Sequence, residues 1–154
     1  MHTLTTALPP KFRSVCCFFG YSFVLHLLWE NAQAPLYAGF TDNVRQHLWA
    51  CLFATATGDM AFSVTLYFVL AVVHRDTWWA AYRTNYQHPA TWTLPPLVGV
   101  LLVVAFELWA IYVVHRWEYG LMPIVPVVRV GLTPVLQMIV VPTVTLLLCR
   151  WHAR

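Results

Sequence analysis

Two acidic residues, Asp59 and Glu107, stand inside long apolar stretches and are the residues best placed to do chemistry. An ionisable side chain at membrane depth is costly, so by default it faces a partner or a water-filled cavity. His26 and Glu30 form a second pair, four residues apart and therefore on one face of a helix. We predict an intramembrane site whose catalytic groups are Asp59, Glu107, His26 and Glu30.

Proton transfer is the chemistry that these side chains suit. A carboxyl group in lipid disfavours its charged form, so one acid can stay protonated at neutral pH and act as general acid. A nearby histidine or second carboxylate would be the base. The substrate would be lipophilic, such as an isoprenoid- or sterol-like chain that is isomerised or cyclised. The same groups could instead bind a small ligand, bind an ion or relay protons, so whether the chain is an enzyme stays open.

Structural roles compete with each of these assignments. His26 could simply hydrogen-bond across helices, and Glu30 could mark the end of a span in interfacial water. Arg129 could be a topological anchor, or the counter-ion that keeps Glu107 or Asp59 charged. In a structural subunit or assembly factor of a larger membrane complex, the polar faces would contact a partner instead of a ligand.

Metal and cofactor motifs give little support. There is no HExxH, and the Glu-x-x-His pairs of di-iron bundles are absent, so we predict no metal site. A haem with two histidine ligands could use His26 with His47 or His115, which are otherwise interfacial, but no feature favours it. The cofactor is therefore left undetermined.

The composition defines a membrane protein. Of 154 residues, 60% are apolar and 10% are charged, whereas about a quarter of a soluble domain is charged. A soluble enzyme, a disordered chain and a nucleic-acid-binding module are thereby excluded, because each needs a polar exterior. The partners expected are the lipid bilayer, a lipophilic small molecule, and a second copy of the chain or a larger membrane complex.

Four charge-poor runs predict four transmembrane helices. Their approximate bounds are 14–30, 48–73, 96–115 and 128–148. Each is long enough for about 30 Å of hydrocarbon, and none alternates as barrel strands do. We therefore predict an all-α, polytopic four-helix bundle that forms a single membrane domain over 1–154.

Lysine and arginine set the orientation. Six lie on the side of the two termini and three on the other side, which places both termini in the cytoplasm by the positive-inside rule. The six are Lys11, Arg13, Arg75, Arg83, Arg150 and Arg154, and the three are Arg45, Arg116 and Arg129. A cleaved signal peptide is the alternative for the first span; Pro35 after the cut, with His26 and Glu30 inside the pattern, counts against it.

Local features mark the span ends. Seven tryptophans fall near them, as in an aromatic belt: Trp29, Trp49, Trp78, Trp79, Trp92, Trp117 and Trp151. The polar loop around Trp78 and Trp79 is expected to lie along the headgroups. In the last span, Pro134 and Pro142 should kink the helix, and Pro134 would free the carbonyl of Val130.

Polar residues recur at helical spacing in every span. In chain order they are Ser22, His26 and Glu30; Thr55, Asp59 and Ser63; Glu107 and His115; and Arg129, Thr133 and Gln137. We expect these faces to meet in one outward-opening cavity, floored by Asp59 about 18 Å below the surface. The residues predicted to bind the ligand are Arg129, Gln137, Thr133, Trp109 and Tyr119.

The polar and aromatic motifs also carry a family resemblance. They are His26-Leu27-Leu28-Trp29-Glu30 with Pro35-Leu36-Tyr37, Gly58-Asp59, Trp117-x-Tyr119 with Met122-Pro123 and Pro126, and Gly131-Leu132-Thr133-Pro134 with Gln137 and Pro142. The set resembles a group of small bacterial four-span membrane proteins of unknown function, which implies an inner-membrane location and no activity. Fainter likenesses concern two short elements. Trp29-Glu30 is similar to an element of membrane-bound terpene cyclases of fungal meroterpenoid pathways, and His26-x-x-x-Glu30 to emopamil-binding-type sterol isomerases.

Overall fold

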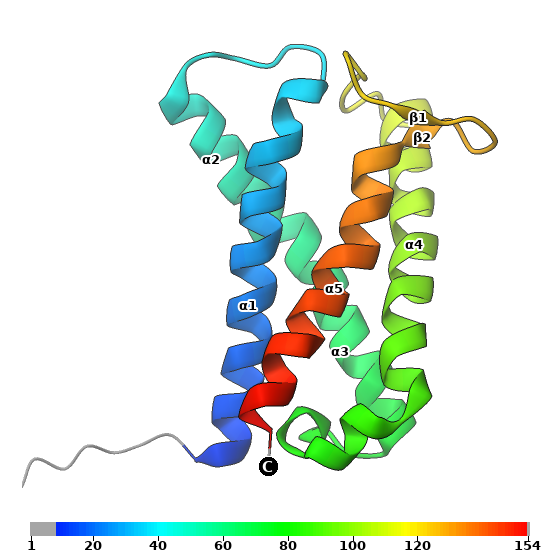
Figure 1. The fold of residues 1–154 in the computed structure, drawn as a ribbon. Coiled ribbons are helices and arrows are strands. Elements are labelled where there is room, and N and C mark those ends of the chain that lie inside the picture. Colours follow the sequence, from blue (N-terminus) through cyan, green and yellow to red (C-terminus); the bar gives the residue numbers. More distant parts are fainter. Residues whose placement is uncertain (1–8, 154) are drawn as a thin grey trace, which may run out of the picture.

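A computed structural model describes residues 9–153 and has four long helical segments side by side (Figure 1). By length and composition all four can cross a membrane: Pro10–Leu36, Val44–His74, Pro89–Tyr112 and Leu132–His152. The predicted all-α, four-helix membrane bundle is thus confirmed. Arg154, which was counted in the charge balance, lies outside the described residues.

The first span is helix α1 (Pro10–Gln33), continued by the short 3₁₀ helix η1 (Ala34–Leu36). It begins earlier than the predicted residue 14, because Pro10 occupies the first helical position, where its missing N–H costs nothing. The side chains of Ser14, Phe18, Ser22 and His26 are buried along one face. This four-residue repeat is the helical stripe that the sequence predicts.

The second span contains a change of helical geometry. Helix α2 (Val44–Ala54) is followed by the π-helical segment η2 (Thr55–Asp59) and by α3 (Met60–His74). At the end of η2 the amide of Met60 donates to the carbonyl of Thr55, five residues back instead of four. Such π-segments are rare inside α-helices and frequently occur at functional sites. No sequence pattern used above indicates this one.

The third and fourth spans are α4 (Pro89–Tyr112) and α5 (Leu132–His152). They pack closely, since a Cβ on Gly99 would lie 3.0 Å from the carbonyl oxygen of Met138. Pro134 lies in the first turn of α5, where it interrupts no helical hydrogen bond. The prediction that Pro134 frees the carbonyl of Val130 within a helix is therefore wrong.

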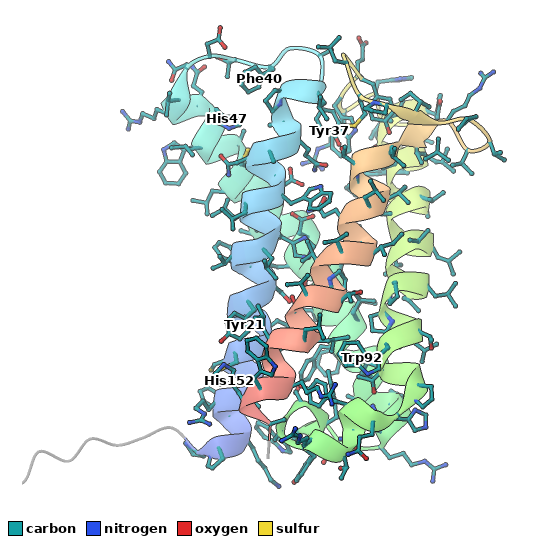
Figure 2. All side chains as sticks on the ribbon, viewed as in Figure 1. Tyr21, Tyr37, Phe40, His47, Trp92 and His152 are labelled. Atoms are coloured by element: carbon teal, nitrogen blue, oxygen red, sulfur yellow. The ribbon has the colours of Figure 1, made fainter. Side chains whose placement is uncertain are left out.

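Two loop systems close the ends of the bundle. The short helices η3 (Trp79–Ala81) and η4 (Arg83–Gln87) lie at the end that carries both chain termini. At the opposite end, strands β1 (Ile124–Val125) and β2 (Val130–Gly131) form an antiparallel pair. Figure 2 shows the labelled Tyr21, Trp92 and His152 towards the first end, and Tyr37, Phe40 and His47 towards the second.

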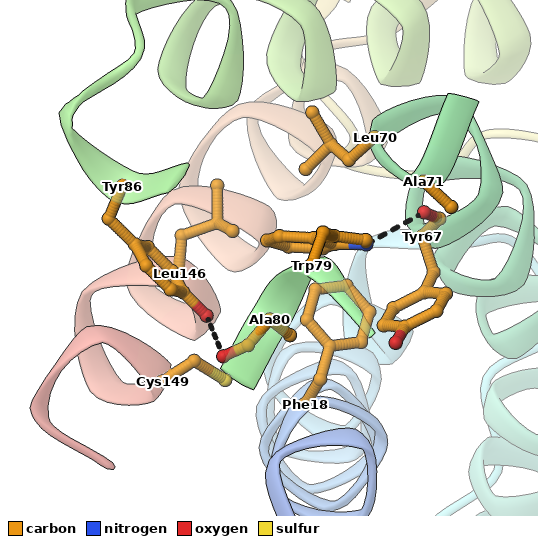
Figure 3. Packing of buried hydrophobic residues seen from close by; sticks show 9 residues of the cluster. All are labelled: Phe18, Tyr67, Leu70, Ala71, Trp79, Ala80, Tyr86, Leu146 and Cys149. Carbon is orange, nitrogen blue, oxygen red and sulfur yellow. Dashed lines mark hydrogen bonds between the residues drawn. The ribbon is translucent and has the colours of Figure 1, made fainter. Parts of the chain in front are cut away.

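An aromatic core fills the end that carries the termini (Figure 3). Its buried members are Phe18, Tyr67, Leu70, Ala71, Trp79, Ala80, Tyr86, Leu146 and Cys149. Trp79 is fully buried, and its indole N–H donates to the carbonyl of Tyr67 at 3.1 Å. The expectation that Trp79 belongs to an interfacial belt is therefore wrong: the loop folds back into the bundle because the indole finds an acceptor there.

Candidate functional site

A cavity of about 310 Å³ lies in the end of the bundle away from the termini. All four spans and two loops line it. Three of its lining residues carry carboxyl groups: Glu30 from α1, Asp59 from η2 and Glu107 from α4. Five aromatic side chains complete much of the wall: Tyr37, Phe40, Phe62, Phe106 and Trp117. The deep acids of two different spans therefore face one space.

Gln137 of α5 connects the polar groups of α1. Its amide nitrogen lies 2.9 Å from His26 Nδ1 and 3.3 Å from Glu30 Oε1, and its amide oxygen accepts from Gln33 Nε2 at 3.3 Å. The Gln33 nitrogen also donates to Glu30 Oε1 at 2.5 Å. Glu30 thus receives two amide donors, an arrangement that suits a charged carboxylate.

A single donor-only group fixes the direction of this network. The indole of Trp29 can only donate, and it does so to Gln33 Oε1 at 3.2 Å. Gln33 Nε2 must then face Glu30 and the oxygen of Gln137, which turns Gln137 Nε2 towards His26. Assigned in this way, His26 Nδ1 is an acceptor, and the imidazole is neutral with its proton on Nε2.

Asp59 has no such support. Its side chain is buried, and its Oδ1 lies 3.8 Å from His26 Nδ1, which is too long for a hydrogen bond. Its Oδ2 has no hydrogen-bond partner among residues 9–153, and neither has the hydroxyl of Thr55 one turn before it. A buried carboxylate without donors is costly, so the surroundings favour a protonated Asp59.

Glu107 is tied to the loop that precedes α5. The hydroxyl of Tyr119 donates to Glu107 Oε2 and accepts from the amide of Gly131 at 2.6 Å. Burial, reinforced by the contact with Glu107, raises the pKa of Tyr119 above its ordinary value, so this hydroxyl stays a donor. Glu107, which is 3% exposed, is thereby held at the edge of the cavity.

Part of the cavity wall is formed by α2, η2 and α4. After η2 in the chain, α3 packs against α4. Before η2, α2 packs chiefly against α1 and η2, and in Figure 1 it leans away from α4. Ala50 and Thr57 of this segment line the cavity and are exposed. Across from them, the rings of Phe62 and Phe106 meet edge-to-face at 5.7 Å. This side of the cavity faces the surface that a bilayer would cover.

The predicted site residues divide into two groups. Those brought to the cavity are Asp59, Glu107, Glu30 and Gln137, with His26 one hydrogen bond behind Gln137. Their catalytic and binding roles stay predictions.

Four predicted ligand-binding residues do not line the cavity: Arg129, Thr133, Trp109 and Tyr119. Arg129 precedes α5 in a left-handed turn (φ 54°) and is exposed, so it does not continue the stripe of Thr133 and Gln137. His115 likewise follows the end of α4 (φ 49°) and is exposed.

The other three of these four residues lie away from the cavity wall. The hydroxyl of Thr133 donates to Met122 Sδ at 2.9 Å, and Trp109 is 45% exposed on the outside of α4. Tyr119 hydrogen-bonds to Glu107 and does not itself line the cavity. His47, expected at the interface, lines the cavity.

Two participants were missed from the sequence. Gln33 lies seven residues after His26, so helical spacing extends the same face to it. Trp29 was read only as a belt residue, although it orients Gln33. Within residues 9–153, no group of three or more His, Cys, Asp or Glu side chains is placed to hold a metal ion.

No protein-family model, curated protein or solved structure matches this chain. The class defined by the fold is a multi-pass membrane protein in contact with lipid.

Proposed function

We propose that this chain is a single-domain protein of a bacterial inner membrane that binds a lipophilic molecule in its cavity and moves protons on it. The substrate is an isoprenoid- or sterol-like chain, and the reaction is an isomerisation or cyclisation. The observation that carries the proposal is the convergence of three carboxyl groups on one aromatic-walled cavity.

The donor counts assign the roles of the acids. Asp59, whose Oδ2 has no hydrogen-bond partner among the described residues, acts as the general acid, whereas Glu30 receives two amide donors and acts as the carboxylate base. In an isomerisation, the Asp59 O–H adds its proton to one carbon of a double bond. Glu30 or Glu107 then removes a proton from a neighbouring carbon, so the double bond moves with no change of oxidation state.

The walls of the cavity fit such a step. The positive charge that develops on the substrate is stabilised by nearby carboxylates and by the faces of aromatic rings such as Phe106. The substrate enters sideways from the bilayer between α2 and α4. With the termini in the cytoplasm, as the lysine and arginine distribution favours, the cavity lies in the outer half of the membrane.

Solvent deuterium tests the chemistry without knowledge of the substrate. Membranes that contain the protein are incubated in D₂O, and the extracted neutral lipids are analysed for carbon-bound deuterium by mass spectrometry. We expect one lipid class to gain deuterium with the native chain. The Asp59→Asn variant should lower the rate by about 10²- to 10⁴-fold, because a carboxamide cannot donate the proton.

The matched control is Asp42→Asn, which changes an exposed acid in the loop before α2 and should leave the rate unchanged. Equal labelling by native chain and Asp59→Asn would contradict the assignment of Asp59. No carbon-bound deuterium with any chain would overturn the proton-transfer function and favour ligand binding or transport.

A further inference from the structure

A second cavity, of about 340 Å³, lies at the opposite end of the bundle and is basic. It is lined by the start of α1, by the loop between α3 and α4, and by the end of α5. Its basic side chains are Lys11, Arg13 and His152. None of the polar groups in the first cavity contributes to it, so it is independent of the proposed function.

Aromatic rings hold two of these groups in place. The ammonium of Lys11 lies 5.7 Å from the centre of the Tyr82 ring. The imidazole of His152 stacks on Tyr21, and its Nε2 lies 2.7 Å from the Tyr21 hydroxyl, as the neighbouring labels in Figure 2 show. These rings hold the side chains of Lys11 and His152 at the wall of the cavity.

The positive charge of this cavity is only partly offset within the described chain. Among residues 9–153, no ion pair joins Lys11 or Arg13 to an acid. The acid of the adjoining loop, Asp76, is an electrostatic neighbour of Lys11 but forms no ion pair with it, and its Oδ1 accepts the amide of Trp78 at 2.8 Å. No acidic side chain lies in the first turn of α1, so the partial positive charge of this helix end adds to that of Lys11 and Arg13.

The surroundings point to a lipid as the source of the anion. Phe12 and Trp151, beside the basic residues in sequence, are 46% and 80% exposed on the surface that the bilayer would cover. A phosphate in the cavity would therefore have its acyl chains against an apolar helix surface. We infer that this basic cavity binds the phosphate of an anionic phospholipid, as basic pockets between transmembrane helices do.

Native mass spectrometry of the full chain in detergent tests this inference. The protein is titrated with phosphatidylglycerol and, separately, with phosphatidylcholine of the same acyl chains. We expect tighter binding of phosphatidylglycerol. Lys11→Gln and Arg13→Gln should each weaken it about fivefold, and the double variant about thirtyfold, without changing phosphatidylcholine binding.

Two further variants test whether the lipid preference depends on a specific site, and not only on the net charge of the chain or on its correct folding. The doubly charge-conserving Lys11→Arg/Arg13→Lys variant should keep most of the preference. Arg45→Gln/Arg129→Gln, which removes two exposed arginines at the other end, should keep all of it. Equal binding of the two lipids, or an equal loss in the Arg45/Arg129 variant, would overturn the inference.

Inorganic phosphate identifies the source of the anion. If millimolar phosphate leaves the phosphatidylglycerol complexes intact, the ligand is a lipid, as inferred. If it displaces the lipid and protects the Lys11 and Arg13 side chains from chemical labelling by itself, the cavity recognises soluble phosphate, and the lipid assignment is wrong.

Discussion

The two ends of this bundle use the same four spans in different ways. At the end of the termini, the side chains of Trp79 and Tyr86 are fully packed, and their polar atoms donate to backbone carbonyls. At the other end, acids surround a cavity, and Asp59 Oδ2 has no partner among the described residues. Departures from good packing are expected where a protein functions, and this contrast is why we propose a reaction site at the cavity end.

The π-helical segment η2 lies at the boundary between these ends. On one side of it, α3 packs against α4, and on the other side α2 leans towards α1. Asp59 is the last residue of η2 and thus stands where the close packing stops. The change in helical geometry therefore positions both the acid and part of the cavity wall.

The largest expected effect is on the packed end. Trp79→Ala should lower the free energy of unfolding in detergent by about 3–5 kcal/mol, because it empties a fully buried site. Phe62→Ala at the cavity should lower it by only about 1–2 kcal/mol, since its ring is half-buried and already borders open space. Unfolding free energies are measured by denaturant titration, and equal losses in the two variants would contradict the difference in packing between the two ends.

The hydrogen-bond network of the cavity should give a smaller effect. Gln137→Leu leaves His26 Nδ1 without its partner, removes one hydrogen bond each from Glu30 and Gln33, and should cost about 1–3 kcal/mol of stability. The control is Gln46→Leu, at an exposed side chain, which should change stability by less than about 0.5 kcal/mol. If both variants unfold alike, Gln137 does not join α1 to α5 as described.

Tyr119→Phe should have the smallest effect of the three, about 1–2 kcal/mol, because it removes one donor to Glu107 and the acceptor of one amide. Because the pKa of Tyr119 is raised, the difference in unfolding free energy between the native chain and Tyr119→Phe should depend on pH. Below its ordinary pKa of 10.0 the hydroxyl is neutral in both folded and unfolded chains, so the difference is constant. Above pH 10 the unfolded chain loses the Tyr119 proton first, so the extra stability of the native chain over Tyr119→Phe decreases.

Unfolding of both proteins between pH 7 and 11 measures this dependence. Tyr112→Phe, at an exposed hydroxyl on the carbonyl of Arg129, is the matched control and should show a smaller loss of stability at pH 7. A Tyr119 advantage that declines well below pH 10 would contradict the described contact.

The spans and their inward faces could be predicted because both depend on local periodicity. A run of about 20 apolar residues identifies a span, and four-residue spacing places Ser22 and His26, or Thr55 and Asp59, on one face. Buried side chains at all four positions match that spacing. Gln137 meets His26 across 111 residues through the packing of α5 on α1, and not through the predicted stripe of Arg129, Thr133 and Gln137.

What could not be predicted depends on tertiary structure. Arg129 and His115 were assigned to helical stripes, but left-handed backbone conformations place them outside the helices. Trp79 resembles an interfacial residue in its sequence context, and only the fold supplies the carbonyl that its indole needs. The cavity itself results from the divergence of α2 and α4, which no residue type in either helix specifies.

The central claim, that the cavity holds a lipophilic molecule, is tested most directly by filling it. Gly58 lines the cavity and Gly20 is exposed on α1, and a Cβ at either position meets nothing within 4 Å. Lipid extracts of the purified native, Gly58→Leu and Gly20→Leu chains are compared by mass spectrometry. We predict a copurified molecule that is depleted from Gly58→Leu and retained by Gly20→Leu; equal extracts from all three would contradict the account.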